Sequence, residues 1–197
     1  MTGKEELRLL LRDTCPPAAP GPSGAVALGA SGVPAAVLVG LLAHPDGARV
    51  VLTERNPDLR VHAAQISFPG GCIEEMDDGP AAAALREAFE EIGLPGSKVE
   101  LLGCLPPHFT VTGFLVHPFV GWIEPPVEFV PDPREVARII EVPLDFVLDA
   151  ANHRRETMEV DGVVHHFYAL YYAGHRIWGA TAGILVSLAR LLEEEKR

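Results

Sequence analysis

The sequence is poor in cysteine and has no long uninterrupted apolar segment. Its three cysteines, Cys15, Cys72 and Cys104, are widely spaced and form no CxxC pair. This argues against a disulfide framework and a structural zinc site, and it favours reduced thiols in the cytoplasm. The longest apolar run, residues 33–43, contains Pro34 and Gly40 and falls well short of the roughly 20 residues that span a bilayer. We therefore expect a cytoplasmic protein with no membrane partner.

Basic residues are also scarce. The chain has 16 Lys and Arg against 27 Asp and Glu, which gives a formal net charge of -11. Such a balance argues against binding to a nucleic-acid backbone. A small anionic substrate would have to be bound by metal ions and a few local arginines. The 197 residues, 48% of them hydrophobic, are enough for one sizeable core.

The order of apolar patterns and turn signals predicts the organisation of the chain. A short amphipathic helix is expected at 4–12, followed by a Pro/Gly/Ala-rich loop at 15–32. Residues 1–32 are thus part of, or appended to, a single domain at 33–197. Strands are predicted at 35–42, 48–55, 99–105, 114–123, 157–160 and 163–171, helices at 79–93, 144–150 and 181–196, and a proline-rich loop at 124–133. Pro45-Asp46-Gly47 and Asp161-Gly162 indicate hairpins. The pattern predicts an α/β sandwich.

The most informative feature pairs a glycine turn with clustered carboxylates. Phe68-Pro69-Gly70-Gly71 precedes the helix expected at 79–93, in which Glu87, Glu90 and Glu91 stand at i, i+3 and i+4. Because each residue turns a helix by about 100°, these acids should share one face and repel one another. A hard cation such as Mg²⁺ or Mn²⁺ explains such a cluster of oxygen ligands.

The other face of the same helix is expected to pack on the core. Apolar residues recur there at helical spacing, namely Ala81, Leu85, Ala88, Phe89 and Ile92. Gly93 is expected to end the helix, and Pro95 prevents its continuation.

Gly71 together with the run from Arg86 to Leu94 resembles the Nudix box of the Nudix hydrolases, which cleave a nucleoside diphosphate linked to another moiety. Either Asp77 or Asp78 supplies the early acidic position of that pattern. The resemblance implies a Nudix-type α/β/α sandwich with a mixed central sheet and Mg²⁺ or Mn²⁺ as cofactor.

Segments outside the box are similar to the coenzyme A pyrophosphatase subgroup. They include Leu52-Thr53-Glu54-Arg55, Leu59-Arg60-Val61-His62, Gln65-Ile66-Ser67-Phe68-Pro69-Gly70-Gly71 and Ile177-Trp178-Gly179-Ala180-Thr181-Ala182. Two positions differ: Ala64 replaces a usual glycine, and Cys72 replaces a usual basic residue.

The resemblance also implies roles for individual residues. Glu87 and Glu91 would be metal ligands, Glu90 a further ligand or an orienter of water, and the Gly71 carbonyl a final ligand. Arg86 completes the catalytic set as a structural partner of Glu87 or of the Asp77/Asp78 pair.

Substrate contacts are expected from Gly70, which lets the backbone approach closely, and from Arg55, Arg60 and His62. The arginines could bind phosphate by bidentate hydrogen bonds, although solvated surface is the alternative for each. Glu135 is interpreted as part of a surface loop.

The predicted function is hydrolysis of the pyrophosphate bond of coenzyme A or its thioesters. The products would be adenosine 3′,5′-bisphosphate and (acyl-)4′-phosphopantetheine. Two alternatives stay open: a Nudix pyrophosphatase for ADP-ribose, NADH, a dinucleotide or a nucleoside triphosphate, and a non-catalytic nucleotide sensor. The expected partner is a small nucleotide substrate, and a homodimer is left open.

Overall fold

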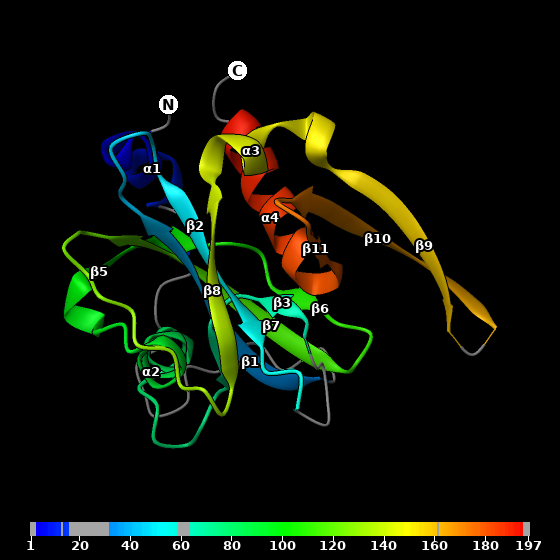
Figure 1. The fold of residues 1–197 in the computed structure, drawn as a ribbon, viewed down its shortest axis with the longest axis horizontal. Coiled ribbons are helices and arrows are strands. Elements are labelled where there is room, and N and C mark those ends of the chain that lie inside the picture. Colours follow the sequence, from blue (N-terminus) through cyan, green and yellow to red (C-terminus); the bar gives the residue numbers. More distant parts are fainter. Residues whose placement is uncertain (1–2, 13, 16–31, 59–63, 161, 195–197) are drawn as a thin grey trace.

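A computed structural model describes residues 3–12, 14–15, 32–58, 64–160 and 162–194 (Figure 1). Its centre is an eight-stranded sheet in which β3, β2, β1, β7 and β5 follow one another, while β4 pairs with β1, β6 with β7 and β8 with β2. The strands are β1 (Val33–Leu42), β2 (Arg49–Arg55), β3 (Ile66–Ser67), β4 (Gly70–Cys72), β5 (Val99–Cys104), β6 (His108–Phe109), β7 (Phe114–Ile123) and β8 (Val136–Pro143).

The sheet is mixed. β1 and β7 run parallel, from Val33 opposite Phe114 to Leu42 opposite Ile123, while the other pairs are antiparallel. The β1–β2 hairpin closes with Leu42 opposite Arg49, as the Pro45-Asp46-Gly47 turn predicts. β1 is almost entirely buried, which suits a strand covered on both faces.

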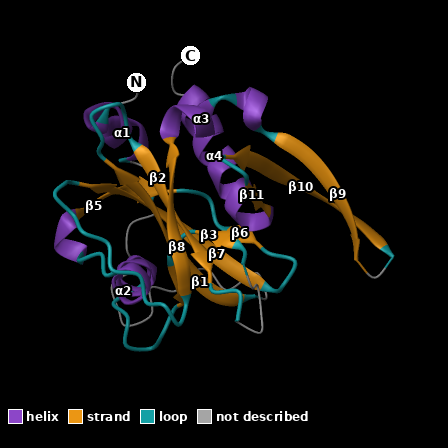
Figure 2. Cartoon of the chain, in the orientation of Figure 1, coloured by secondary structure: helices purple, strands orange, loops and turns teal. Residues whose placement is uncertain are grey.

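Helices cover both faces of this sheet (Figure 2). One face packs against α2 (Pro80–Ile92) through a cluster that includes Leu38, Ala88 and Ile92. The other carries α1 (Lys4–Leu11), the short α3 (Leu144–Leu148) and α4 (Gly179–Glu194), which share a second apolar cluster. Turns of 3₁₀ helix lie at η1 (Gly96–Lys98) and η2 (Ala150–Asn152). The predicted α/β sandwich with a mixed central sheet is therefore confirmed.

The strands predicted at 157–160 and 163–171 are confirmed, but they belong to a second sheet, which projects beside α4. It consists of β9 (Arg154–Val160), β10 (Val163–Tyr172) and β11 (His175–Trp178), with β10 in the middle. The β9–β10 hairpin extends away from the main sheet (Figure 1). Trp178 lies half-buried on this sheet against Phe167, because it alternates with the buried Ile177.

No helix within the described part of the chain is both long and apolar enough to cross a membrane.

Candidate active site

The glycine turn is shaped by close contacts that exclude side chains. β4 pairs with β1 so that Gly70 lies opposite Val37 and Gly71 opposite Ala36. A Cβ atom on Gly71 would come within 2.5 Å of Oε1 of Glu87, and one on Gly70 within 2.4 Å of the Ala36 carbonyl oxygen. The Gly71 backbone therefore lies directly against the Glu87 carboxylate.

Helix α2 begins with Pro80 at its first turn and ends at Gly93, whose left-handed conformation (φ 66°) directs its N–H to the carbonyls of Ala88 and Phe89. This fits the preference for proline at the start and glycine at the end of a helix. The boundaries agree with the prediction from sequence.

The two faces of α2 differ from the prediction. Phe89, expected in the core, is 58% exposed, whereas Glu91 is only 3% exposed. Glu91 follows Ala88 and Ala84 at i+3 and i+7, and both alanines are fully buried. Helical spacing thus turns Glu91 with them toward the sheet. Glu90 is exposed and Glu87 intermediate, so the three carboxylates run from solvent into the protein.

Arg86 connects the helix to the preceding loop. Its Nε and Nη2 donate to the two carboxylate oxygens of Asp77 at 2.9 and 3.0 Å, and Nη2 also donates to the Cys72 carbonyl at 3.1 Å. The guanidinium hydrogen bonds hold the pKa of Asp77 below its ordinary value. Of the two aspartates that the sequence left open, Asp77 is therefore the one that pairs with Arg86. Asp78 is exposed.

Arg86 also reaches the acidic cluster. Its Nη1 donates to Glu87 Oε1 at 2.8 Å and to Glu90 Oε2 at 3.2 Å. Burial nevertheless raises the pKa of Glu87, against the opposing effect of Arg86.

Glu91 is the most perturbed acid of the site. Burial raises its pKa to about 8, and Arg55, with Nη1 3.7 Å from Glu91 Oε1, opposes this effect only in part. Its Oε2 is buried without a hydrogen-bond partner. A buried oxygen of this kind is costly unless something compensates it.

Glu135, which immediately precedes β8, belongs to the electrostatic surroundings of the same cluster. Its charge raises the pKa of both Glu87 and Glu91. The sequence pattern did not distinguish it from Glu124, Glu128 and Asp132 in the same region. Only the folded chain brings residues 87 and 135 together, because the loop before β8 lies beside α2.

The donor set fits a hard divalent cation. It consists of carboxylate oxygens and a glycine backbone, together with the unpartnered Oε2 of Glu91. Among the described residues no three His, Cys, Asp or Glu side chains already form a metal cage, since Arg86 binds Glu87 and Glu90 while Arg55 faces Glu91. Small side-chain movements would have to turn these oxygens toward an ion.

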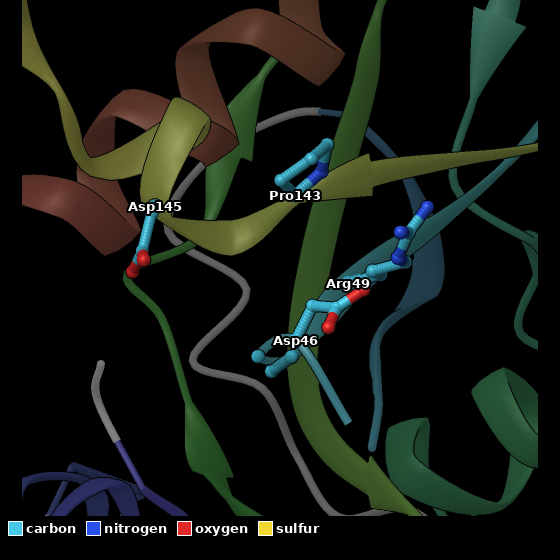
Figure 3. Close-up of a pocket in the computed structure, with 6 residues that line it drawn as sticks. Asp46, Arg49, Pro143 and Asp145 are labelled. Carbon is cyan, nitrogen blue, oxygen red and sulfur yellow. The ribbon is translucent and has the colours of Figure 1, made fainter. Parts of the chain in front are cut away.

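The other predicted substrate contacts are only partly visible. Arg55 ends β2 and faces the acidic cluster, and Gly70 lies in the turn beside it. Arg60 and His62 fall outside the described residues. A surface hollow lined by Asp46, Gly47, Ala48, Arg49, Pro143 and Asp145 (Figure 3) lies at the hairpin end of β1, whereas the glycine turn pairs with the other end. It contains none of the predicted site residues.

Comparison with known proteins identifies the class. The NUDIX domain family model matches residues 33–160, and the chain belongs to the Nudix family. It is a Nudix hydrolase, an enzyme that cleaves pyrophosphate bonds in its substrates.

Its similar relatives include two bacterial proteins described as uncharacterized Nudix hydrolase NudL. The protein from Klebsiella pneumoniae is 41% identical over 155 residues, covering 79% of this chain and 80% of the relative. The protein from Photorhabdus laumondii is 40% identical over 159 residues, covering 81% and 84%. A solved structure of a C. elegans Ap4A hydrolase shares the fold, with a TM-score of 0.52 over 82% of this chain and 95% of that one at 14% identity.

Proposed function

We propose that this Nudix hydrolase cleaves the pyrophosphate bond of coenzyme A or acyl-coenzyme A. Water attacks one phosphorus, the bond from that phosphorus to the bridging oxygen breaks, and a proton is released. The products are adenosine 3′,5′-bisphosphate and (acyl-)4′-phosphopantetheine. The reaction needs no reductant, oxidant or second substrate.

The observation that carries the proposal is the way in which the subgroup-like segments meet at the glycine turn. Thr181 lies in the first turn of α4, within the 177–182 segment, and its buried hydroxyl donates to the Ile66 carbonyl at 3.0 Å. The Arg55 backbone N–H donates to the Gln65 carbonyl at 2.9 Å. Three segments that resemble coenzyme A pyrophosphatases are therefore joined beside the acidic cluster, and one of them, at 177–182, lies far from the other two in the sequence.

Glu87, Glu90 and Glu91, with the Gly71 carbonyl, would hold Mg²⁺ or Mn²⁺. The cation would neutralise charge on the phosphates and so favour attack by water. Arg86 is held in place by Asp77, and it orients the carboxylates of Glu87 and Glu90 by hydrogen bonds. A cation at Glu91 would also compensate a carboxylate that burial otherwise disfavours in its charged form.

Substrate phosphates would meet Arg55 and the Gly70 backbone, with Arg60 and His62 as further contacts. Arg55 stands 3.7 Å from Glu91, too far for a strong hydrogen bond, so its donors are available to a phosphate. The residues from 33 onward would act as one domain in the cytoplasm.

Product analysis tests the proposal. Purified protein with Mg²⁺ or Mn²⁺ would be incubated separately with coenzyme A, acetyl-coenzyme A, ADP-ribose, NADH and dGTP, and the products would be identified by mass. We expect adenosine 3′,5′-bisphosphate and 4′-phosphopantetheine from coenzyme A. Efficient hydrolysis of ADP-ribose, NADH or dGTP with coenzyme A left intact would move the assignment to another Nudix pyrophosphatase. Binding without hydrolysis of any of them would favour a sensor.

A further inference from the structure

Two arginines converge on one phenol where the second sheet packs against α4. Tyr168 lies on β10, directly opposite Arg155 of β9, and Arg190 reaches it from α4. Nη2 of Arg155 donates to Tyr168 Oη at 3.3 Å, and Nη2 of Arg190 donates to the same oxygen. Their guanidinium carbons lie 5.7 and 5.4 Å from the centre of the Tyr168 ring.

These two positive charges have no counter-charge among the described side chains. No such carboxylate lies within 4.0 Å of the Arg155 or Arg190 guanidinium. Both arginines are exposed and Tyr168 is half-buried, so the remaining N–H donors are accessible. The chain has a net charge of -11, so carboxylates are abundant. Two arginines that share one oxygen without a neighbouring carboxylate are therefore unusual in this protein.

The other face of the same hairpin shows what a compensated arrangement looks like. Arg176 stacks on Trp178 with its guanidinium carbon 4.9 Å from the ring centre, but it also donates to Glu156 at 2.6 Å. Tyr171 donates to the second oxygen of Glu156 at 2.8 Å. The hairpin therefore places an acid between aromatic and arginine side chains on one face and omits it on the other.

The cluster is separate from the acidic site. Helix α4 packs in the apolar cluster on one face of the main sheet, and α2, which carries Glu87 and Glu91, packs in the cluster on the opposite face. A ligand on Arg155 and Arg190 therefore does not occupy the position of a substrate phosphate at the glutamates.

We propose that Arg155, Tyr168 and Arg190 form a second binding site for the phosphate group of a small phosphate monoester. The two guanidinium groups match the charge of a phosphate dianion, and their planar N–H pairs suit its oxygens. The Tyr168 hydroxyl supplies a further donor. A monocarboxylate would leave one of the two positive charges uncompensated. The inference does not depend on which substrate the glutamate site cleaves.

The test uses the Nε–Hε resonances of the arginines in the full-length protein. Inorganic phosphate and glycerol 3-phosphate are titrated at constant ionic strength, with acetate as the monoanion comparison. We expect the Arg155 and Arg190 signals to shift saturably with both phosphates and weakly with acetate, while the Arg176 signal stays in place. Because the readout is local, phosphate bound at the glutamates does not affect the outcome.

Single substitutions test whether each arginine contributes to phosphate binding. Arg190→Gln and, on the exposed hairpin, Arg155→Gln should each weaken phosphate binding by at least about tenfold, because each removes one charge-assisted donor group. Arg176→Gln should leave the affinity unchanged. Shifts that fail to saturate, or an equal effect of Arg176→Gln, would overturn the proposal. Retained affinity in both Arg155→Gln and Arg190→Gln would do so as well.

Discussion

At the scale of single residues, the three glutamates of α2 are not equivalent. Glu90 is exposed, Glu87 is partly covered, and Glu91 is buried with one oxygen unpartnered. Without a bound cation, keeping these carboxylates charged costs a different amount of free energy at each position. The cost is largest at Glu91, because burial raises the pKa of Glu91 to about 8. A neutral side chain at position 91 should therefore be tolerated by the fold and harmful to catalysis.

We predict that Glu87→Gln and Glu91→Gln each lower kcat by at least about two orders of magnitude. Loss of a preorganised group that stabilises charge typically costs about 3 to 4 kcal/mol in the transition state. Thermal stability of the cation-free protein should be unchanged or higher in Glu91→Gln, since Gln is neutral at every pH and burial disfavours the charged form of Glu91. Steady-state kinetics at saturating Mg²⁺ provide the measurement, with the exposed hairpin variant Glu159→Gln as control. Near-normal turnover in either variant would remove that residue from the site.

Cys72 directly follows Gly71 and is exposed. Its side chain does not pack into the core, so Cys72→Lys should be tolerated and should place a cation beside the substrate phosphates. One exposed charge contributes about 1 kcal/mol or less, so KM for coenzyme A should fall severalfold at low salt and less at high salt. Cys72→Met controls for side-chain length. An unchanged or higher KM in a folded Lys variant would reject this role.

The partner of Arg86 and the exposure of Phe89 could not be predicted from the sequence. The spacing of the box fits neither Asp77 nor Asp78 perfectly, and the choice depends on a loop whose path brings Asp77 to Arg86. Phe89 lies four residues beyond Leu85, which is only about 40° away in helical angle, so periodicity includes it in the apolar face. In the folded protein it is exposed.

At the scale of elements, the contact between α2 and the loop after β4 fixes the geometry of the site. Arg86 spans Asp77, the Cys72 carbonyl and Glu87. The Asp77 side chain is 3% exposed, so this ion pair is largely removed from water. Breaking one partner of such a pair is costly because the other remains buried and charged.

Asp77→Asn should therefore lower the free energy of unfolding by about 3 kcal/mol. Asp78→Asn, a matched change one residue away at an exposed position, should alter it by less than about 0.5 kcal/mol. Denaturant titration of both variants measures the difference. Equal stabilities of the two variants would show that the Arg86 network does not hold the loop to the helix.

Contact between β6 and α4 predicts a pH dependence. His108 packs so closely on Gly183 that a Cβ there would come within 2.6 Å of its ring, and burial lowers the pKa of His108. The unfolded chain thus binds a proton more readily than the folded protein. This histidine reduces stability as pH falls below its unfolded pKa of about 6.5, and the loss is complete below its folded pKa.

His108→Gln should consequently show a smaller loss of stability between about pH 7.5 and about pH 5.5 than the unmodified protein. Denaturant titrations at the two pH values provide the measurement, and His166→Gln on the exposed hairpin controls for loss of a histidine. An identical loss in His108→Gln and the parent protein would contradict the assignment.

The elements themselves were largely predictable where they are long. The β1–β2 hairpin, β5, β7, α2 and α4 follow from apolar periodicity and turn residues. The two- and three-residue strands β3, β4 and β6 have too few positions to show a pattern, and they exist because longer neighbours pair with them. β8 alternates buried and exposed positions irregularly, which hid it from a period-of-two pattern.

At the scale of the whole molecule, the fold brings together segments that lie far apart in the sequence. The Thr181 hydroxyl is hydrogen-bonded to the Ile66 carbonyl. Glu54 forms an ion pair with Arg138 at 2.9 Å, and Nδ1 of His175 lies 3.9 Å from the same Glu54 oxygen. These contacts place the C-terminal segment beside the glycine turn. The residues within each segment indicate its resemblance to the subgroup. They do not indicate that the segments meet in space, because that depends on how the second sheet and α4 pack against the main sheet.

We propose that this convergence selects coenzyme A as the substrate. Only coenzyme A offers a 3′-phosphate and a pantetheine arm in addition to the pyrophosphate, so these groups must supply the discrimination. Dephospho-coenzyme A separates the two contributions, since it lacks the 3′-phosphate and keeps the arm.

The most direct measurement is kcat/KM for coenzyme A and for ADP-ribose under the same conditions with Mg²⁺ or Mn²⁺. We predict a ratio of at least about tenfold in favour of coenzyme A, which corresponds to about 1.4 kcal/mol of differential transition-state stabilisation. A ratio of one, or a preference for ADP-ribose, would contradict it.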